Sequence, residues 1–288
     1  MPLRGEKGKH PDLNSAFRTP HSAFPETPLV SFLLQLYLNQ FILFVLVLTR
    51  ISGLVMTAPI YGSNSVPLRI RGFLAVGLAM MITPTQNAEI LEVPEHLVGI
   101  VIMMGRELVL GLALGLAVMI LFTGLQLAGQ IIGQTSGMSL ADVFDPTLQT
   151  NIAVFSQLLD IITLSVFLTI GGHRQVLHAL LDTFRWRPPG GDGLPARLID
   201  IMTTVTSESF LIGIRVGAPV MVALMLAIVI LGLISRTLPQ LNILAVGFSL
   251  NSFIMLMTLS FSLGAIAWVV QERADVIIES VHAVLIEQ

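Results

Sequence analysis

The sequence predicts an all-α membrane protein, and its composition and its long apolar segments are the observations behind this prediction. Of its 288 residues, 54% are hydrophobic and only 11% are charged, and the mean hydropathy is +0.84. A water-soluble surface cannot be built from so few charged residues. Several apolar segments are separated by short polar connections, and a chain of this length can form a bundle of several helices.

The first 28 residues are predicted to be a disordered tail and not a signal peptide. Five prolines and four basic residues fall in this stretch, and it lacks an apolar core followed by a small-residue cleavage site. Residues 29–288 are then predicted to form a single helical domain.

The first apolar segment, Leu29–Thr49, is the simplest membrane-crossing candidate. Its 21 residues would form a helix of about 31 Å, which matches a hydrocarbon thickness of about 30 Å. We expect this helix to span the bilayer.

Two later segments do not fit an upright crossing. Gly72–Thr83 has 12 residues and would make a helix of only about 18 Å, so it is predicted not to span alone. The 34 residues from Thr237 to Val270 carry no charge and would make a helix of about 51 Å. We expect this stretch to bend or to leave the membrane plane, with candidate bends at Asn242, Gly247 and Asn251.

The basic residues do not alternate between connections as membrane orientation requires. Arg69 and Arg71 fall in one connection, and the next, around Pro94, contains no Lys or Arg. Two explanations stay open: the orientation rule is statistical, or several of the helices do not cross the bilayer at all.

Charged residues also interrupt the apolar segments. Each would cost about 3 kcal/mol if it were left unpaired at the bilayer centre, so each needs a partner, water or an interfacial position. Asp160 and Arg215 are a candidate pair. The charged residues within the apolar segments are Arg50, Arg106, Glu107, Asp160, Glu208 and Arg215.

Glycines recur at four-residue spacing in three segments. Gly129, Gly133 and Gly137 would share one helix face, and the pairs Gly111/Gly115 and Gly213/Gly217 repeat the spacing. Such stripes allow close helix approach in membranes. Because each glycine also weakens a helix by about 1 kcal/mol, the triple stripe predicts either tight packing or a segment that unwinds.

Catalytic interpretations of this region are weak. Asp142 and Asp145 form a DxxD pattern that could hold Mg²⁺, but Asp145 followed by Pro146 is typical of a helix start. Ser139 with His173 or His178 as its base would suggest an intramembrane protease, but Ala141 replaces the second glycine of a nucleophile elbow.

A small-solute transporter also stays open as an alternative, since broken repeats are typical of that class. The chain has no cysteine, and its scattered basic residues exclude a nucleic-acid surface.

Short motifs occur in a fixed order over about residues 45–255. Their residues are Arg50, Pro59, Gly62, Pro67, Asp145, Pro146, His173, Arg236, Pro239, Gln240 and Gly247, together with the glycine segment. In their order and spacing, these motifs resemble the FliR family, the export-gate membrane proteins of flagellar type III secretion. Four residues differ from those common in the family: Gln130, Thr135, Ser136 and Gly171.

The resemblance implies a non-enzymatic gate subunit without catalytic residues, metal or cofactor. It implies bent helical hairpins packed with FliP-like and FliQ-like subunits, FlhB-like and FlhA-like neighbours, and a channel for unfolded export substrates. The expected location is the bacterial inner membrane, in contact with lipid, within the flagellar basal body; a virulence injectisome is the alternative machine. A plug loop is implied at about 129–151, with apolar closure by Met138, Leu140, Val143 and Phe144 beside the three glycines.

Overall fold

The computed structural model describes residues 28–59, 67–86, 91, 93–94, 96–136, 154–191, 193–238 and 243–286, without the side chains of 28–35, 154–155 and 243–245. The helices in chain order are α1 (Pro28–Thr57), α3 (Leu68–Ile82), η2 (Thr83–Thr85), α4 (Leu97–Thr135), α6 (Val154–Thr169), α7 (Gly172–Trp186), α8 (Leu198–Thr237) and α9 (Ile243–Ile286). The described residues contain no strand, which confirms the all-α prediction.

The chain divides into two compact units, Met1–Leu38 and Asn39–Gln288. The first unit contains the start of α1. Residues 1–27, which are all but the last residue of the predicted tail, lie outside the described residues. Every contact discussed below lies within the second unit.

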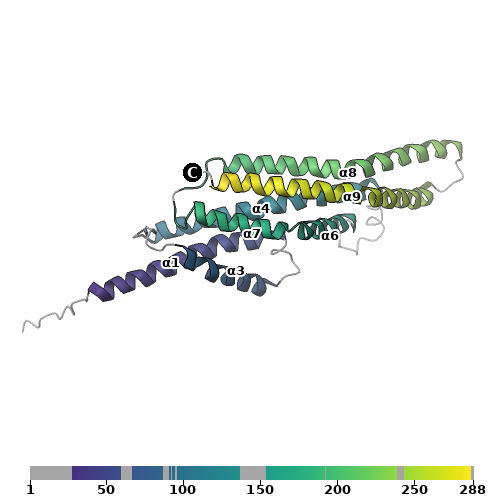
Figure 1. Ribbon diagram of the computed structural model, residues 1–288. Coiled ribbons are helices and arrows are strands. Elements are labelled where there is room, and N and C mark those ends of the chain that lie inside the picture. Colours follow the sequence, from purple (N-terminus) through teal and green to yellow (C-terminus); the bar gives the residue numbers. More distant parts are fainter. Residues whose placement is uncertain are drawn as a thin grey trace, which may run out of the picture. The chain divides into compact units, whose positions relative to one another are not determined.

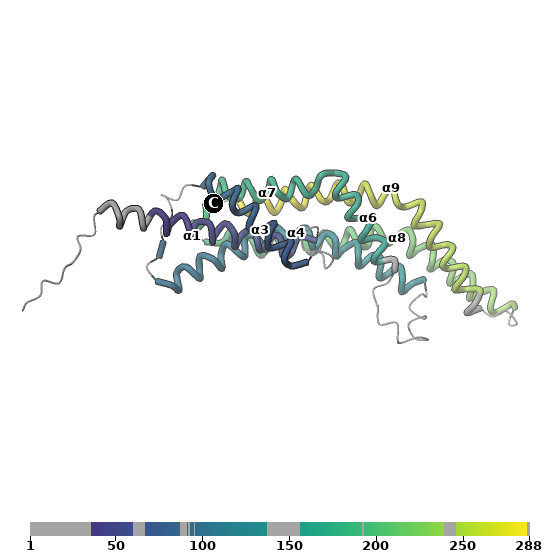
Figure 2. The backbone as a smooth tube through the Cα atoms, turned by 90° about the horizontal axis from the view of Figure 1, so that it is seen from below, coloured from purple at the N-terminus to yellow at the C-terminus, as the bar shows by residue number. Residues whose placement is uncertain are grey.

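The second unit is built on three long helices. In Figures 1 and 2, α4, α8 and α9 run alongside one another, and each of the three contacts the other two. Their lengths of 39, 40 and 44 residues correspond to about 58–66 Å. All three greatly exceed a bilayer core of about 30 Å.

Within the described residues, five helices are long and apolar enough to cross a membrane, and there are six candidates if the bent pair α6 and α7 counts as one span. The first, predicted at Leu29–Thr49, continues to Thr57. Leu68–Thr85 also qualifies, so the prediction that this region is too short was wrong. Leu68 and the three residues after it join α3, and η2 extends the segment by three residues.

The charge-free stretch after Arg236 is a continuous helix over most of its length. The break between α8 and α9 falls after Leu238 and before Ile243, whereas Gly247 and Asn251 lie inside α9. Figure 2 shows α9 as a curved helix. Gly247 and Asn251 are therefore not the sites of a helix break. The third candidate, Asn242, lies outside the described residues.

Glycine and proline account for the bend between α6 and α7 and for the end of α7. Gly171 has φ of 78°, a left-handed conformation that ends helices and that other residues rarely adopt. It lies between α6 and α7, whose axes differ by 64°. Pro188 and Pro189 follow Arg187, and a residue before proline is disfavoured in a helix, so α7 ends at Trp186.

Candidate functional site: a buried arginine cluster beside the long-helix core

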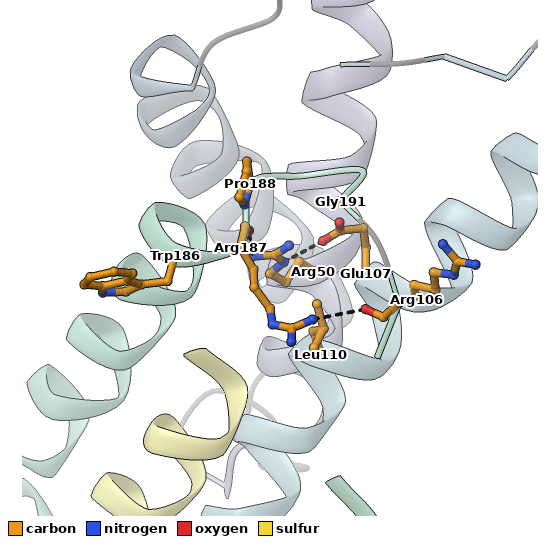
Figure 3. Close-up of a pocket in the computed structure, with 9 residues that line it drawn as sticks. Arg50, Arg106, Glu107, Leu110, Trp186, Arg187, Pro188 and Gly191 are labelled. Carbon is orange, nitrogen blue, oxygen red and sulfur yellow. Dashed lines mark hydrogen bonds and ion pairs between the residues drawn. The ribbon is translucent and has the colours of Figure 1, made fainter. Parts of the chain in front are cut away.

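Arg50 lies in α1 and is almost completely buried, with 1% of its surface exposed. Its Nε donates to Oε2 of Glu107 on α4 at 2.5 Å, and Glu107 is 3% exposed. Figure 3 shows the two side chains pointing toward each other. Pairing with hydrogen-bond contact is what makes two charges tolerable in an apolar interior.

The end of α7 completes the surroundings of Arg50. Its Nη1 donates to the backbone carbonyl of Arg187 at 3.0 Å and to Oγ1 of Thr183 at 3.4 Å. The guanidinium carbon lies 4.4 Å from the ring centroid of Phe184, a distance at which cation–π attraction operates. Arg50 therefore links α1 to α7 as well as to α4.

The second carboxylate oxygen of Glu107 binds the α7–α8 connection. The backbone N–H of Gly190 donates to Oε1 at 2.9 Å, and Gly190 has φ of 83°. A Cβ there would lie 2.5 Å from Leu91 and 2.7 Å from Met103, so this position requires glycine for both conformation and space. We call Arg50, Glu107, Thr183, Phe184, Arg187 and Gly190 the arginine cluster.

A cavity of about 410 Å³ opens beside the arginine cluster. Figure 3 shows residues of α4 and of the end of α7 around it. Among the residues that the structure describes, its lining includes three arginines and one glutamate. The lining consists of Arg50, Arg106, Glu107, Leu110, Trp186, Arg187, Pro188, Gly191 and Gly193.

Two of the predicted glycine stripes are points of close helix contact. A Cβ on Gly111 would clash with the backbone carbonyl of Arg50, and one on Gly115 with Oγ1 of Thr57. These two glycines let α4 pack directly on the backbone of α1. The prediction of close approach is confirmed here.

The second stripe packs α8 on α4. A Cβ on Gly213 would lie 2.5 Å from the carbonyl oxygen of Gly124, and Gly217 faces Ala128 across the same seam. Ser209 reinforces the seam, because its hydroxyl donates to the carbonyl of Ile120. The α4–α8 contact is therefore fixed by small residues on both sides.

Only part of the third stripe, Gly129, Gly133 and Gly137, lies within the described residues. Gly129 and Gly133 are buried in the last turns of α4, so the predicted plug segment, which begins at 129, starts inside a regular helix. Ser136 caps that helix by donating from its hydroxyl to Gly133 at 2.8 Å. The remaining residues predicted there lie outside the described part of the chain: Gly137, Met138, Ser139, Leu140, Asp142, Val143, Phe144, Asp145 and Pro146.

The other motif residues do not gather at one site. His173 is half-buried near the start of α7, Arg236 is exposed at the end of α8, and Gly247 is buried in α9. Pro59 and Pro67 flank the connection between α1 and α3. Gly62, Pro239 and Gln240 lie outside the described residues.

The predicted pair of Asp160 and Arg215 is not formed. Asp160 accepts a hydrogen bond from Nε2 of Gln126 at 3.0 Å, because α6 packs on α4. Arg215 lies on the exposed face of α8. Glu208 instead pairs with Arg273 of α9 at 3.2 Å, a partner that was not among the predicted residues.

A second polar contact joins α7 to α9. Gln175 donates to Asp275 at 2.9 Å, and Nε2 of His282 lies 3.5 Å from Asp182. A pocket of about 210 Å³ between them also includes His178 and Glu279. Within the described residues, no group of three or more His, Asp or Glu side chains is arranged to hold a metal ion.

Sequence reasoning singled out Arg50 and Glu107 but not their pairing, and it missed Thr183, Phe184 and Gly190. The Gly190–Gly191 pair before Pro195 was the available signal for a turn. The partner of a buried charge on another helix leaves no such local signal.

Most of the chain matches a known family of proteins. Residues 41–276 match the family described as "Bacterial export proteins, family 1". Flagellar biosynthetic protein FliR of Escherichia coli (strain K12) is 35% identical over 208 residues, which cover 71% of this chain and 77% of that protein. FliR of Bacillus subtilis (strain 168) is 31% identical over 229 residues, which cover 76% and 86%. FliR of Aquifex aeolicus (strain VF5) is 28% identical over 232 residues, which cover 81% and 86%. The match extends through the arginine cluster and the long-helix core, and the chain belongs to this family of bacterial export proteins, which includes the flagellar biosynthetic protein FliR.

Proposed function

We propose that this chain is a pore and gate subunit of the flagellar type III protein export apparatus, in the bacterial inner membrane within the flagellar basal body. It would form part of the channel through which unfolded export substrates pass. Membership of the FliR family carries the proposal, and the relatives described above are named as flagellar proteins, which favours a flagellum over an injectisome.

The lengths of α4, α8 and α9 support an assembly in which helices are raised from the bilayer plane. Helices of about 58–66 Å cannot lie upright within about 30 Å of hydrocarbon. Partner subunits would then cover the apolar surface that lipid does not reach. This surface is extensive: Val222, Met225 and Val229 on α8 are each more than 60% exposed, as are Phe253 and Phe261 on α9.

We assign this covering to FliP-like and FliQ-like subunits, with FlhB-like and FlhA-like components as neighbours in the apparatus. The long helices would form one wall of the channel. The tight α4–α8 seam at Gly124 and Gly213 would keep that wall rigid while substrates pass.

The segment at about 129–151 is proposed as the plug. It begins in the buried last turns of α4, and its Met and Phe residues suit a dry, deformable seal. Deletion of Ser136–Phe144 should raise ion leakage across the inner membrane and slow growth. Normal sealing in that deletion would argue against a plug here.

The first experiment is purification of the tagged chain from its native cells in a mild detergent, followed by mass spectrometry and measurement of the assembly mass. A large, stable complex that contains FliP-like and FliQ-like proteins is expected. Cells lacking the chain should not swim or export flagellar proteins. A monodisperse monomer or homodimer without such companions would contradict the proposal.

A further inference from the structure

Arg106 is adjacent to the buried Glu107 in the chain but belongs to the outer side of α4. In Figure 3 its guanidinium extends away from Arg50 and Arg187. Arg106 is half-buried and takes part in none of the ion pairs within the described part of the chain. A guanidinium at an apolar surface requires an anionic partner or water.

The surface of α4 that leads to Arg106 is apolar. Val98 and Ile102 precede it by eight and four residues and are 69% and 50% exposed. Residues spaced by four lie on one face of a helix. The face therefore presents two exposed aliphatic side chains followed by a cation, which is the arrangement that an amphiphile with an anionic head would match.

The cavity beside Arg106 supplies space for a headgroup. Among its described lining residues, Glu107 neutralises Arg50 and Arg106 adds a positive charge. Trp186 contributes to the rim and is 58% exposed. Exposed tryptophan is typical of the level of lipid headgroups, and basic pockets between membrane helices bind such headgroups.

We propose that this surface is a binding site for an anionic phospholipid. The phosphate contacts Arg106, the acyl chain lies along Ile102 and Val98, and the rest of the headgroup enters the cavity of about 410 Å³. The chemistry recognised is a phosphate group attached to an apolar chain. The proposal does not depend on the export role, because it requires only that the protein lies in a membrane.

The test is native mass spectrometry of the complex purified from its own cells and equilibrated with equal amounts of phosphatidylglycerol and phosphatidylethanolamine. We expect the wild type to retain about fivefold more phosphatidylglycerol, as one basic contact provides. Arg106→Gln should abolish this preference and Arg106→Lys should preserve it. Arg236→Gln, which removes an exposed arginine at the end of α8, is the matched control and should behave as the wild type.

Three outcomes would overturn the proposal. The first is an unchanged lipid preference in Arg106→Gln, provided that its elution profile is as monodisperse as that of the wild type. The second is displacement of the lipid by millimolar inorganic phosphate, which would indicate a site for a free anion. The third is a photo-crosslinking residue at position 106 that couples to another protein chain and to no lipid, which would assign Arg106 to a subunit interface.

Discussion

Arg50 shows how one residue can hold several helices together in a protein with few charges. Its guanidinium contacts a carboxylate, a hydroxyl, a carbonyl and an aromatic ring, which come from α4 and the end of α7. Each contact compensates part of the cost of moving the charge out of water. The stability of this region therefore depends on a complete set of partners and not on the ion pair alone.

Replacement of Glu107 by alanine should destabilise the protein strongly. It leaves the buried Arg50 without its carboxylate, which typically costs about 3–5 kcal/mol. Thermal unfolding of the detergent-solubilised protein, followed by tryptophan fluorescence, measures the effect. The control Arg185→Gln removes an arginine whose side chain is 78% exposed and should change stability by less than about 1 kcal/mol. An unfolding temperature of Glu107→Ala close to that of wild type would contradict the role given to the pair.

Gly171 offers a second test at the scale of one residue. Its φ of 78° makes Gly171→Ala unfavourable by about 1–2 kcal/mol, whereas Asn adopts this conformation more readily. The variants should therefore rank Gly, Asn, Ala in decreasing unfolding temperature. Equal stability of Gly171→Asn and Gly171→Ala would show that the backbone at the bend relaxes.

At the scale of the element, small residues determine how the long helices approach. The seam between α4 and α8 is so close that the backbone of Gly213 faces the carbonyl of Gly124. A larger residue on either side must push the two helices apart, because packed interiors contain little free space.

Gly213→Ala and Gly232→Ala form a matched pair of variants on α8. A Cβ at 213 would lie 2.5 Å from a backbone oxygen, whereas one at 232 would meet nothing within 4 Å. We expect Gly213→Ala to lower the free energy of unfolding by about 1–3 kcal/mol. Gly232→Ala should raise it by up to about 1 kcal/mol, because alanine has the higher helix propensity. Thermal unfolding of both variants in one detergent gives the comparison. The interpretation fails if the two substitutions have the same sign.

At the scale of the whole molecule, the exposed apolar surface of α8 requires either lipid or protein to cover it. Val229 is 62% exposed, and the chain contains no cysteine, so a single cysteine can be introduced as a probe. We expect Val229→Cys to resist maleimide in the native complex and to react once the complex is dissociated. Arg185→Cys, on the polar face of α7, should react in both states. Equal reactivity of Val229→Cys in both states would place that face outside any subunit contact.

Several features are predictable from the sequence because they depend on neighbouring residues alone. Proline and glycine mark the ends of α6 and α7, and the spacing of Gly111, Gly115 and Gly213 indicates helix contacts that the structure contains. The short segment at Gly72 was misjudged because Arg71 was taken as its boundary, whereas Arg69 and Arg71 both belong to α3. A charge near a helix end does not stop the helix, since its side chain can reach water.

The sequence by itself determined that the protein is helical, apolar and built from segments that fit no simple pattern of membrane crossing. Composition and residue spacing are properties of neighbouring residues, and these properties decide where helices form. Only the tertiary structure decided that Arg50 meets Glu107, 57 residues away, that Asp160 meets Gln126, and that Arg215 is exposed. Such pairings depend on how helices rotate and cross when they pack, and no single segment encodes that geometry.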